Sequence, residues 1–80
     1  NISKGGICFI TYEELLPGNL LKLEIYLPGE KNPIRAFGRV AWSKRFTIAS
    51  EKDYWGDRYD VGVEFIEIND SDREKIENYF

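Results

Sequence analysis

The stretch LLKLEIYLPGEKNPIRAFGRVAWSK, residues 20–44, decides the fold of this chain. Apolar and polar side chains alternate over residues 20–27, and a period of two is typical of a strand with one face in water. Residues 28–33, PGEKNP, have the composition of a reverse turn. The stretch therefore predicts two antiparallel strands, 20–27 and 34–44, joined as a hairpin.

The second strand of this hairpin has one apolar row and one mixed row. The apolar row is assigned to the core, with the tryptophan packed inside it: Ile34, Ala36, Gly38, Val40 and Trp42. Arg35, Phe37 and Arg39 lie in the other row and are expected on a solvated face. A glycine inside a strand indicates a bulge, a bend or a close backbone approach, so Gly38 marks an irregularity.

Two more strands are predicted on either side of the hairpin. Residues 7–11 are apolar on both faces, which predicts a strand that is covered on both sides or lies deep in a closed sheet, and residues 58–66 alternate again. Residues 12–19 are a connection that is compatible with one helical turn and folds Leu15 or Leu16 onto the core. Residues 45–57 lack a clean period and are predicted to form a long loop, with a ragged strand at its start as an alternative. Its Tyr54 and Trp55 either cover the end of the core or contact a partner.

Residues 69–74, NDSDRE, have the composition of a helix start. Ser71 followed by Glu74 fits a capping box, and Asn69 or Asp70 is the alternative N-cap. Acidic side chains in the first turn also suit the positive end of the helix dipole. An apolar stripe is predicted to pack on the sheet: Ile76, Tyr79 and Phe80. The expected fold class is therefore mostly β, with an antiparallel sheet and one C-terminal helix.

Composition excludes several classes of function. The 80 residues allow one domain, and a formal net charge of −3 argues against binding a nucleic-acid polymer. Histidine is absent, which excludes histidine-based catalysis and histidine-ligated zinc. The single cysteine, Cys8, cannot form an internal disulfide, and it is expected to be a small buried hydrophobe in a reducing compartment. We expect no catalytic residue, no metal and no membrane insertion.

Four strands leave two open edges, which suits an apolar sheet poorly. We therefore expect such a sheet to close with additional strands or to pair with a partner.

The opening segment, NISKGG at residues 1–6, is predicted to be a tight turn that leads into the first strand. Short Asn and Ser side chains form hydrogen bonds with nearby backbone groups, and glycine allows a positive φ. Such a turn leaves hydroxyl, amide and backbone N–H groups facing outward, where they suit an anionic, hydrogen-bonding ligand. From spacing alone, an ordinary turn remains the alternative, and Lys4 is then an exposed turn lysine.

The ordered set of motifs resembles the PilZ domain family. The pattern Asn1-x-Ser3-x-x-Gly6 matches that family's Asp/Asn-x-Ser-x-x-Gly signature. Residues 38–42, GRVAW, resemble its Gly-x-Val-x-Trp strand, and residues 62–65, GVEF, resemble its Gly-Val-x-Phe strand. The resemblance extends over essentially all of residues 1–80 in the right order.

The resemblance implies a Greek-key β-barrel, six-stranded in the family and with fewer strands here, and one C-terminal helix. It implies a non-catalytic receptor for the bacterial second messenger cyclic di-GMP, acting in the cytoplasm without a cofactor. The ligand-binding residues that it implies are Asn1, Ser3 and Gly6. The implied partners are cyclic di-GMP and a protein partner or fused output domain, and a homo-oligomer remains open.

The family's first signature, Arg-x-x-x-Arg, precedes the second one together with the first strand, and we expect the domain of residues 1–80 to lack that segment. Arginine grips phosphate and guanine bidentately, whereas neutral contacts from Asn1 and Ser3 contribute only about 0.5–1.5 kcal/mol each. The alternative is a divergent PilZ-like domain that does not bind the nucleotide and works through protein contacts. An Arg-x-x-x-Arg segment upstream would favour the receptor.

Overall fold

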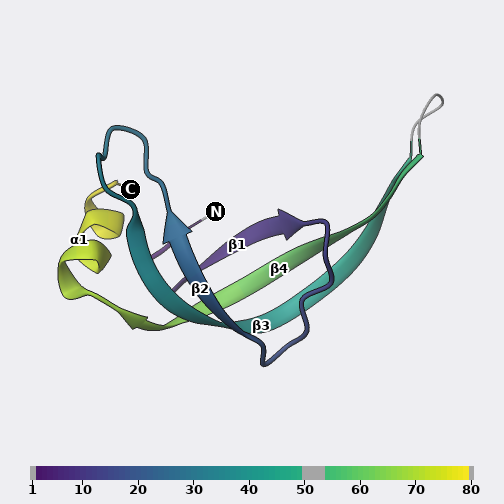
Figure 1. Cartoon of the computed structure of the whole chain (residues 1–80), viewed down its shortest axis with the longest axis horizontal. Coiled ribbons are helices and arrows are strands. Elements are labelled where there is room, and N and C mark those ends of the chain that lie inside the picture. Colours follow the sequence, from purple (N-terminus) through teal and green to yellow (C-terminus); the bar gives the residue numbers. More distant parts are fainter. Residues whose placement is uncertain (1, 50–53, 80) are drawn as a thin grey trace.

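A computed structural model of the chain describes residues 2–49 and 54–79, which form one four-stranded sheet and one helix (Figure 1). The elements are β1 (Gly6–Thr11), β2 (Leu20–Ile25), β3 (Ile34–Ala49), β4 (Tyr54–Ile68) and α1 (Asp70–Tyr79). The expected class, mostly β with one C-terminal helix, is confirmed. Within these residues, no helix is long and apolar enough to cross a bilayer.

The sheet is antiparallel throughout and has the strand order β1-β4-β3-β2. Strands β2, β3 and β4 follow one another through hairpins, while β1 pairs with β4 at the far side. This is Greek-key connectivity read from the C-terminal strand backwards, as the resemblance implies. The predicted hairpin turn is present: Glu30 N–H donates to Leu27 C=O at 3.1 Å, and Gly29 supplies a φ of 85°.

Strands β3 and β4 continue well beyond β1 and β2 as a two-stranded arm (Figure 1). The prediction of a loop is therefore wrong for residues 45–49 and 54–57, and only the strand allowed at its start is present; residues 50–53 lie outside the described residues. Backbone pairing runs from Ser43 opposite Val61 to Ala49 opposite Tyr54, and Thr47 Oγ1 donates to Asp57 Oδ1 at 2.9 Å. The error has a physical cause, because alternation in sequence reports burial on one face and not backbone pairing.

A β-bulge overturns the assignment of Trp42 to the core. Val40 pairs with Val63 and Trp42 with Gly62, so two steps along β3 match one step along β4. The extra residue reverses the alternation, and it places Trp42 on the opposite face of the sheet, 42% exposed. A second register shift lies between Phe37 and Gly38, which confirms the predicted irregularity at that glycine.

The core lies on the inner face of the curved sheet and consists of two clusters. The central cluster is Val40, Val61 and Val63, with half-buried neighbours from β1, β2 and the connection that follows β1. The other cluster joins the β2–β3 turn region to the helix: Leu27, Ile34 and Ile76. The alternation predicted for residues 20–27 is confirmed within β2, since Leu21 and Leu23 pack on the central cluster while Lys22 and Glu24 are exposed.

The connection between β1 and β2 places Leu15 on the central cluster and leaves Leu16 exposed. It has no helical turn. Instead, Asn19 N–H donates to Leu16 C=O at 3.0 Å, and the Asn19 side chain accepts from Leu16 N–H at the same distance. The connection is then tied to β3 by hydrogen bonds from Gly18 N–H to Val40 C=O and from Val40 N–H to Asn19 C=O.

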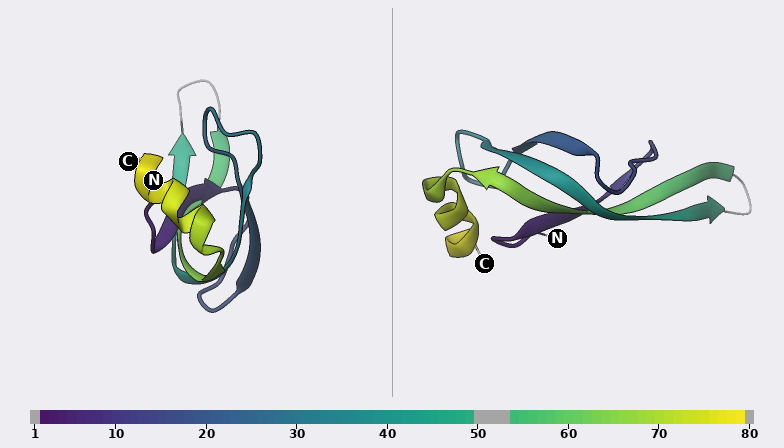
Figure 2. Two further views of the ribbon diagram at one scale, coloured as in Figure 1. Left: turned by 90° about the vertical axis from the view of Figure 1, so that its left-hand side faces the viewer. Right: turned by 90° about the horizontal axis from the view of Figure 1, so that it is seen from below.

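Helix α1 lies at the end of the sheet opposite the arm (Figure 2). Asn69 is its N-cap, because Asn69 Oδ1 accepts from Ser71 N–H at 2.8 Å; this settles the alternatives for the cap. Ile76 is fully buried in the core. Tyr79 is 46% exposed, and Phe80 lies outside the described residues. Of the predicted apolar stripe, Ile76 is therefore the one described residue that is buried.

Strands β1 and β2 are the two edges of the described sheet, as expected for four strands. Their inward side chains border an apolar hollow of about 330 Å³, lined by Phe9 and Leu23 among others. The outer face of β1 is open: Ile10 is 61% exposed, and Cys8 is only half-buried. The predictions of a strand covered on both sides and of a buried Cys8 are therefore wrong for this chain.

Docking of α1 depends on Ile76, so we expect Ile76→Val to lower the free energy of unfolding by about 0.5–1.5 kcal/mol, the usual cost of removing one buried methylene. Asn78→Gln, on the exposed side of the same helix, should change it by less than about 0.5 kcal/mol. Urea denaturation followed by circular dichroism measures both. Equal effects of the two substitutions would show that α1 is not anchored through Ile76.

Candidate functional site

The signature segment forms a tight turn at the start of β1. Ser3 N–H donates to Gly6 C=O at 2.9 Å, and Ile2 bridges to Ile7 across the turn. Gly5 N–H donates to Ser3 Oγ at 3.3 Å, the local hydroxyl–backbone bond that the sequence predicts. Phe65 N–H donates to Gly5 C=O at 3.0 Å and thereby ties the turn to β4. The turn is thus held from both sides.

Gly6 lies against the backbone of β4. A Cβ built at this position would collide with the carbonyl oxygen of Val63, whereas a Cβ on Gly5 would meet nothing closer than Ser3 Oγ at 3.9 Å. The need for glycine at position 6 is therefore steric. It follows from the close approach of two backbones in the pairing of Gly6 with Glu64.

A hollow of about 290 Å³ opens on the outer face of the sheet directly beside this turn. The turn contributes Ser3, Gly5 and Gly6 to its lining, and β3 contributes Trp42. Its remaining lining comes from neighbouring positions on three strands: Ile7, Cys8, Ala41, Gly62, Val63 and Glu64. Polar groups of the turn and an aromatic ring therefore border the same cavity.

Trp42 is the lining residue that the sequence reasoning misplaced. A Cβ on Gly62 would overlap the indole ring, so the ring lies flat against the glycine of the neighbouring strand. Two features of the sequence are compatible with this arrangement. Gly62 lies inside a predicted strand, and the large Trp42 follows Val40 by two positions. Neither feature shows a bulge by itself, because a bulge depends on the partner strand.

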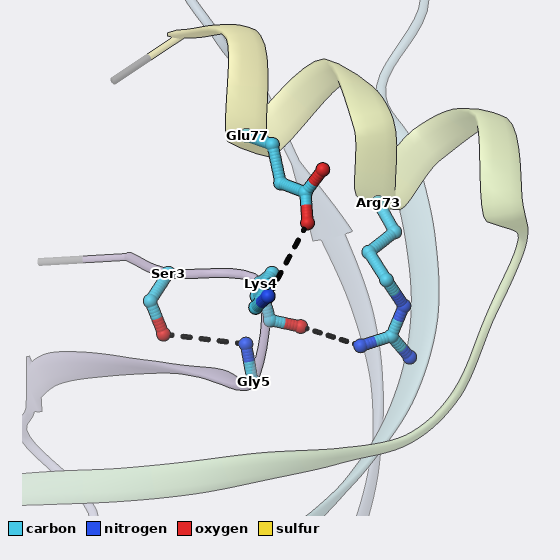
Figure 3. Close-up of polar contacts among 5 residues, drawn as sticks. All are labelled: Ser3, Lys4, Gly5, Arg73 and Glu77. Atoms are coloured by element: carbon cyan, nitrogen blue, oxygen red, sulfur yellow. Dashed lines mark hydrogen bonds and ion pairs between the residues drawn. The ribbon is translucent and has the colours of Figure 1, made fainter.

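Three cations lie near the turn, and each has a protein partner. Arg39 Nη1 lies 3.4 Å from Glu64 Oε1 at the edge of the hollow. Lys4 Nζ lies 3.7 Å from Glu77 Oε1, and Arg73 Nη1 donates to Lys4 C=O at 2.7 Å (Figure 3). The donors that face the hollow from the turn are therefore neutral, and the nearby cations are each held by a carboxylate or a carbonyl.

A larger hollow of about 540 Å³ lies elsewhere, between β2, β3 and the end of β4. Its lining mixes Lys22 and Arg35 with Glu24 and Glu67, and Arg35 Nε lies 3.9 Å from Glu24 Oε1. The Tyr26 hydroxyl donates to Glu24 at 2.9 Å, and this carboxylate raises the pKa of the tyrosine. Opposite charges compensate one another there, so size alone does not make it the better site for an anion.

A family model of the PilZ domain matches residues 1–80. The chain belongs to the PilZ domain family. No curated protein and no solved structure gives a significant match. PilZ domains are generally receptors that bind cyclic di-GMP and carry out no catalysis.

Within this PilZ domain, the structure places two of the three predicted ligand residues at the hollow. Ser3 and Gly6 line it, and Asn1 lies outside the described residues. In the described part of the chain, no group of three potential metal-ligating side chains clusters together. The hollow offers hydrogen-bond donors and an aromatic surface, which are means of binding.

The two glycines of the turn should respond differently to a methyl group. We expect Gly6→Ala to lower the free energy of unfolding of the PilZ domain by about 1–3 kcal/mol, because the Val63 carbonyl must move. Gly5→Ala should leave it unchanged or slightly higher, since the space is open and its φ is not positive. Urea denaturation of both variants tests this difference, and a destabilised Gly5→Ala would contradict it.

Proposed function

We propose that this PilZ domain is a non-catalytic receptor for cyclic di-GMP, which binds at the hollow beside the Ser3–Gly6 turn. The observation that carries the proposal is the meeting of the family signature and Trp42 at one cavity on the outer face. Asn1, Ser3 and Gly6 are the proposed ligand residues, Asn1 by its place in the signature alone. The proposal includes no cofactor, metal or catalytic residue.

The chemistry of the turn suits the ligand's phosphates. Because Ser3 Oγ accepts a hydrogen bond from Gly5 N–H, the hydroxyl hydrogen is available to donate to a phosphate oxygen. Arg39 adds attraction without fixed geometry, since its exposed ion pair with Glu64 is weak and exchanges readily. The exposed indole of Trp42 offers a flat face to a guanine base.

These contacts alone do not reach high affinity. A dissociation constant near 1 μM requires about −8 kcal/mol, several times what a few neutral hydrogen bonds contribute. The family's Arg-x-x-x-Arg signature does not occur near the N-terminus of residues 1–80. We therefore expect measurable binding where an Arg-x-x-x-Arg segment adds bidentate phosphate and guanine contacts to those of residues 1–80.

The receptor is proposed to act in the bacterial cytoplasm and to pass the signal to a protein partner or a fused output domain. The setting follows from the family and from the lone cysteine. A second candidate function, protein contact without nucleotide binding, is favoured by the apolar hollow between the β1 and β2 edges. A homo-oligomer through these edges is testable by sedimentation.

Calorimetric titration of the full-length protein with cyclic di-GMP separates the two functions. A receptor gives saturable heat with a defined stoichiometry. An absence of heat at tens of micromolar protein would exclude the receptor and leave the protein-contact function.

Ser3→Ala in the same protein should weaken binding by about 2- to 12-fold, which corresponds to the loss of one hydrogen bond of about 0.5–1.5 kcal/mol. Ser43→Ala is the matched control, because Ser43 lies on β3 and does not line the hollow. Calorimetry gives both dissociation constants. If both substitutions leave affinity unchanged, the hydroxyl of Ser3 does not contact the ligand.

A further inference from the structure

The signature turn is contacted by a helix that lies almost seventy residues further along the chain. Arg73, in the first turns of α1, donates from Nη1 to the carbonyl oxygen of Lys4 at 2.7 Å (Figure 3). The hydrogen bond is short and charge-assisted, the stronger class of hydrogen bond. It is the closest polar contact described between α1 and the turn.

The carbonyl that Arg73 contacts belongs to the peptide group whose N–H is that of Gly5. That N–H donates to Ser3 Oγ at 3.3 Å on the side of the hollow. One rigid, planar peptide group therefore carries the guanidinium at its carbonyl end and the serine hydroxyl at its amide end. Hydrogen bonds in such a chain polarise one another, so a cation on the carbonyl strengthens the amide as a donor.

The rest of α1 holds Arg73 in place. Its backbone N–H donates to Asn69 C=O at 2.9 Å in the first helical turn. Arg73, Ile76 and Glu77 are spaced three and four residues apart, so they share one helix face, and the burial of Ile76 turns that face toward the sheet. Arg73 thus reaches the turn from an anchored helix.

We infer that Arg73 is a positioning residue of the ligand site: through the Lys4–Gly5 peptide it orients and polarises the Ser3 hydroxyl that donates to the phosphate. This inference rests on the proposed function for its ligand. The relay, which is the pair of hydrogen bonds from Arg73 to the Lys4–Gly5 peptide and from that peptide to Ser3, is present without a ligand. The guanidinium does not line the hollow. It acts through the peptide and gives α1 a part in the site.

The neighbouring ion pair between Lys4 and Glu77 is the competing explanation for any effect of α1 on the site. Its atoms are 3.7 Å apart, and its side chains are 68% and 48% exposed. Ion pairs as exposed as this one contribute little, and they hold no backbone group in a fixed orientation. Glu77 is therefore the matched control: it comes from the same helix face and reaches the same residue.

The test uses the full-length protein and two measurements. Arg73→Met keeps the aliphatic stem and removes the guanidinium, and we expect it to weaken cyclic di-GMP binding about 3- to 10-fold by calorimetry. In ¹⁵N-labelled protein without ligand, the Gly5 amide proton should shift upfield. Arg73→Lys retains a cationic donor and should recover most of both effects. Glu77→Gln should leave the affinity within about twofold and the Gly5 shift unchanged.

The outcomes separate the relay from the receptor. If wild-type protein binds and Arg73→Met binds equally well, or if Glu77→Gln weakens binding as much as Arg73→Met does, the inference is overturned while the receptor stands. If neither the wild-type protein nor any variant binds, the proposed receptor function is rejected, and the positioning role of Arg73 toward the ligand is rejected with it. An unchanged Gly5 amide in Arg73→Met overturns the relay in either case, because that measurement requires no ligand.

Discussion

Three consecutive residues of β4, Val61-Gly62-Val63, are the constraint on which the rest of the structure depends. The two valines point inward and form the centre of the core with Val40. The glycine between them faces outward, and its missing side chain makes room for Trp42. The Val63 carbonyl lies so close to Gly6 that no side chain fits there. Core, bulge and signature turn therefore all meet on one short segment of the central strand.

This arrangement explains why the candidate site lies on the outer face of the sheet. The inner face is occupied by the core, whereas the hollow lined by Ser3, Gly5 and Gly6 opens on the other side. The bulge in β3 turns an aromatic ring to that same side, whereas regular alternation from Val40 would have turned Trp42 inward. Rigid strands thus support the turn, and a binding site on such a scaffold loses little conformational entropy on binding.

Helix α1, the last element of the chain, contacts the turn that borders this site. It is capped by Asn69, anchored by Ile76 and linked to the turn through Arg73. A ligand that pulls on the turn would therefore act on α1 as well, and by thermodynamic linkage a partner that moves α1 would change ligand affinity by the same factor. The arm formed by β3 and β4 extends away from this contact (Figure 1).

The sequence by itself determined the β class, the alternating strand of residues 20–25, the hairpin turn, the C-terminal helix and the family, because period-two burial, turn residues and short motifs are local properties. It also marked Ser3 and Gly6. Only the tertiary structure decided that Trp42 faces outward, that residues 45–49 and 54–57 pair as an arm, and that Arg73 reaches the Lys4 carbonyl. Each of these depends on the register or position of a distant segment, and no local pattern contains that information.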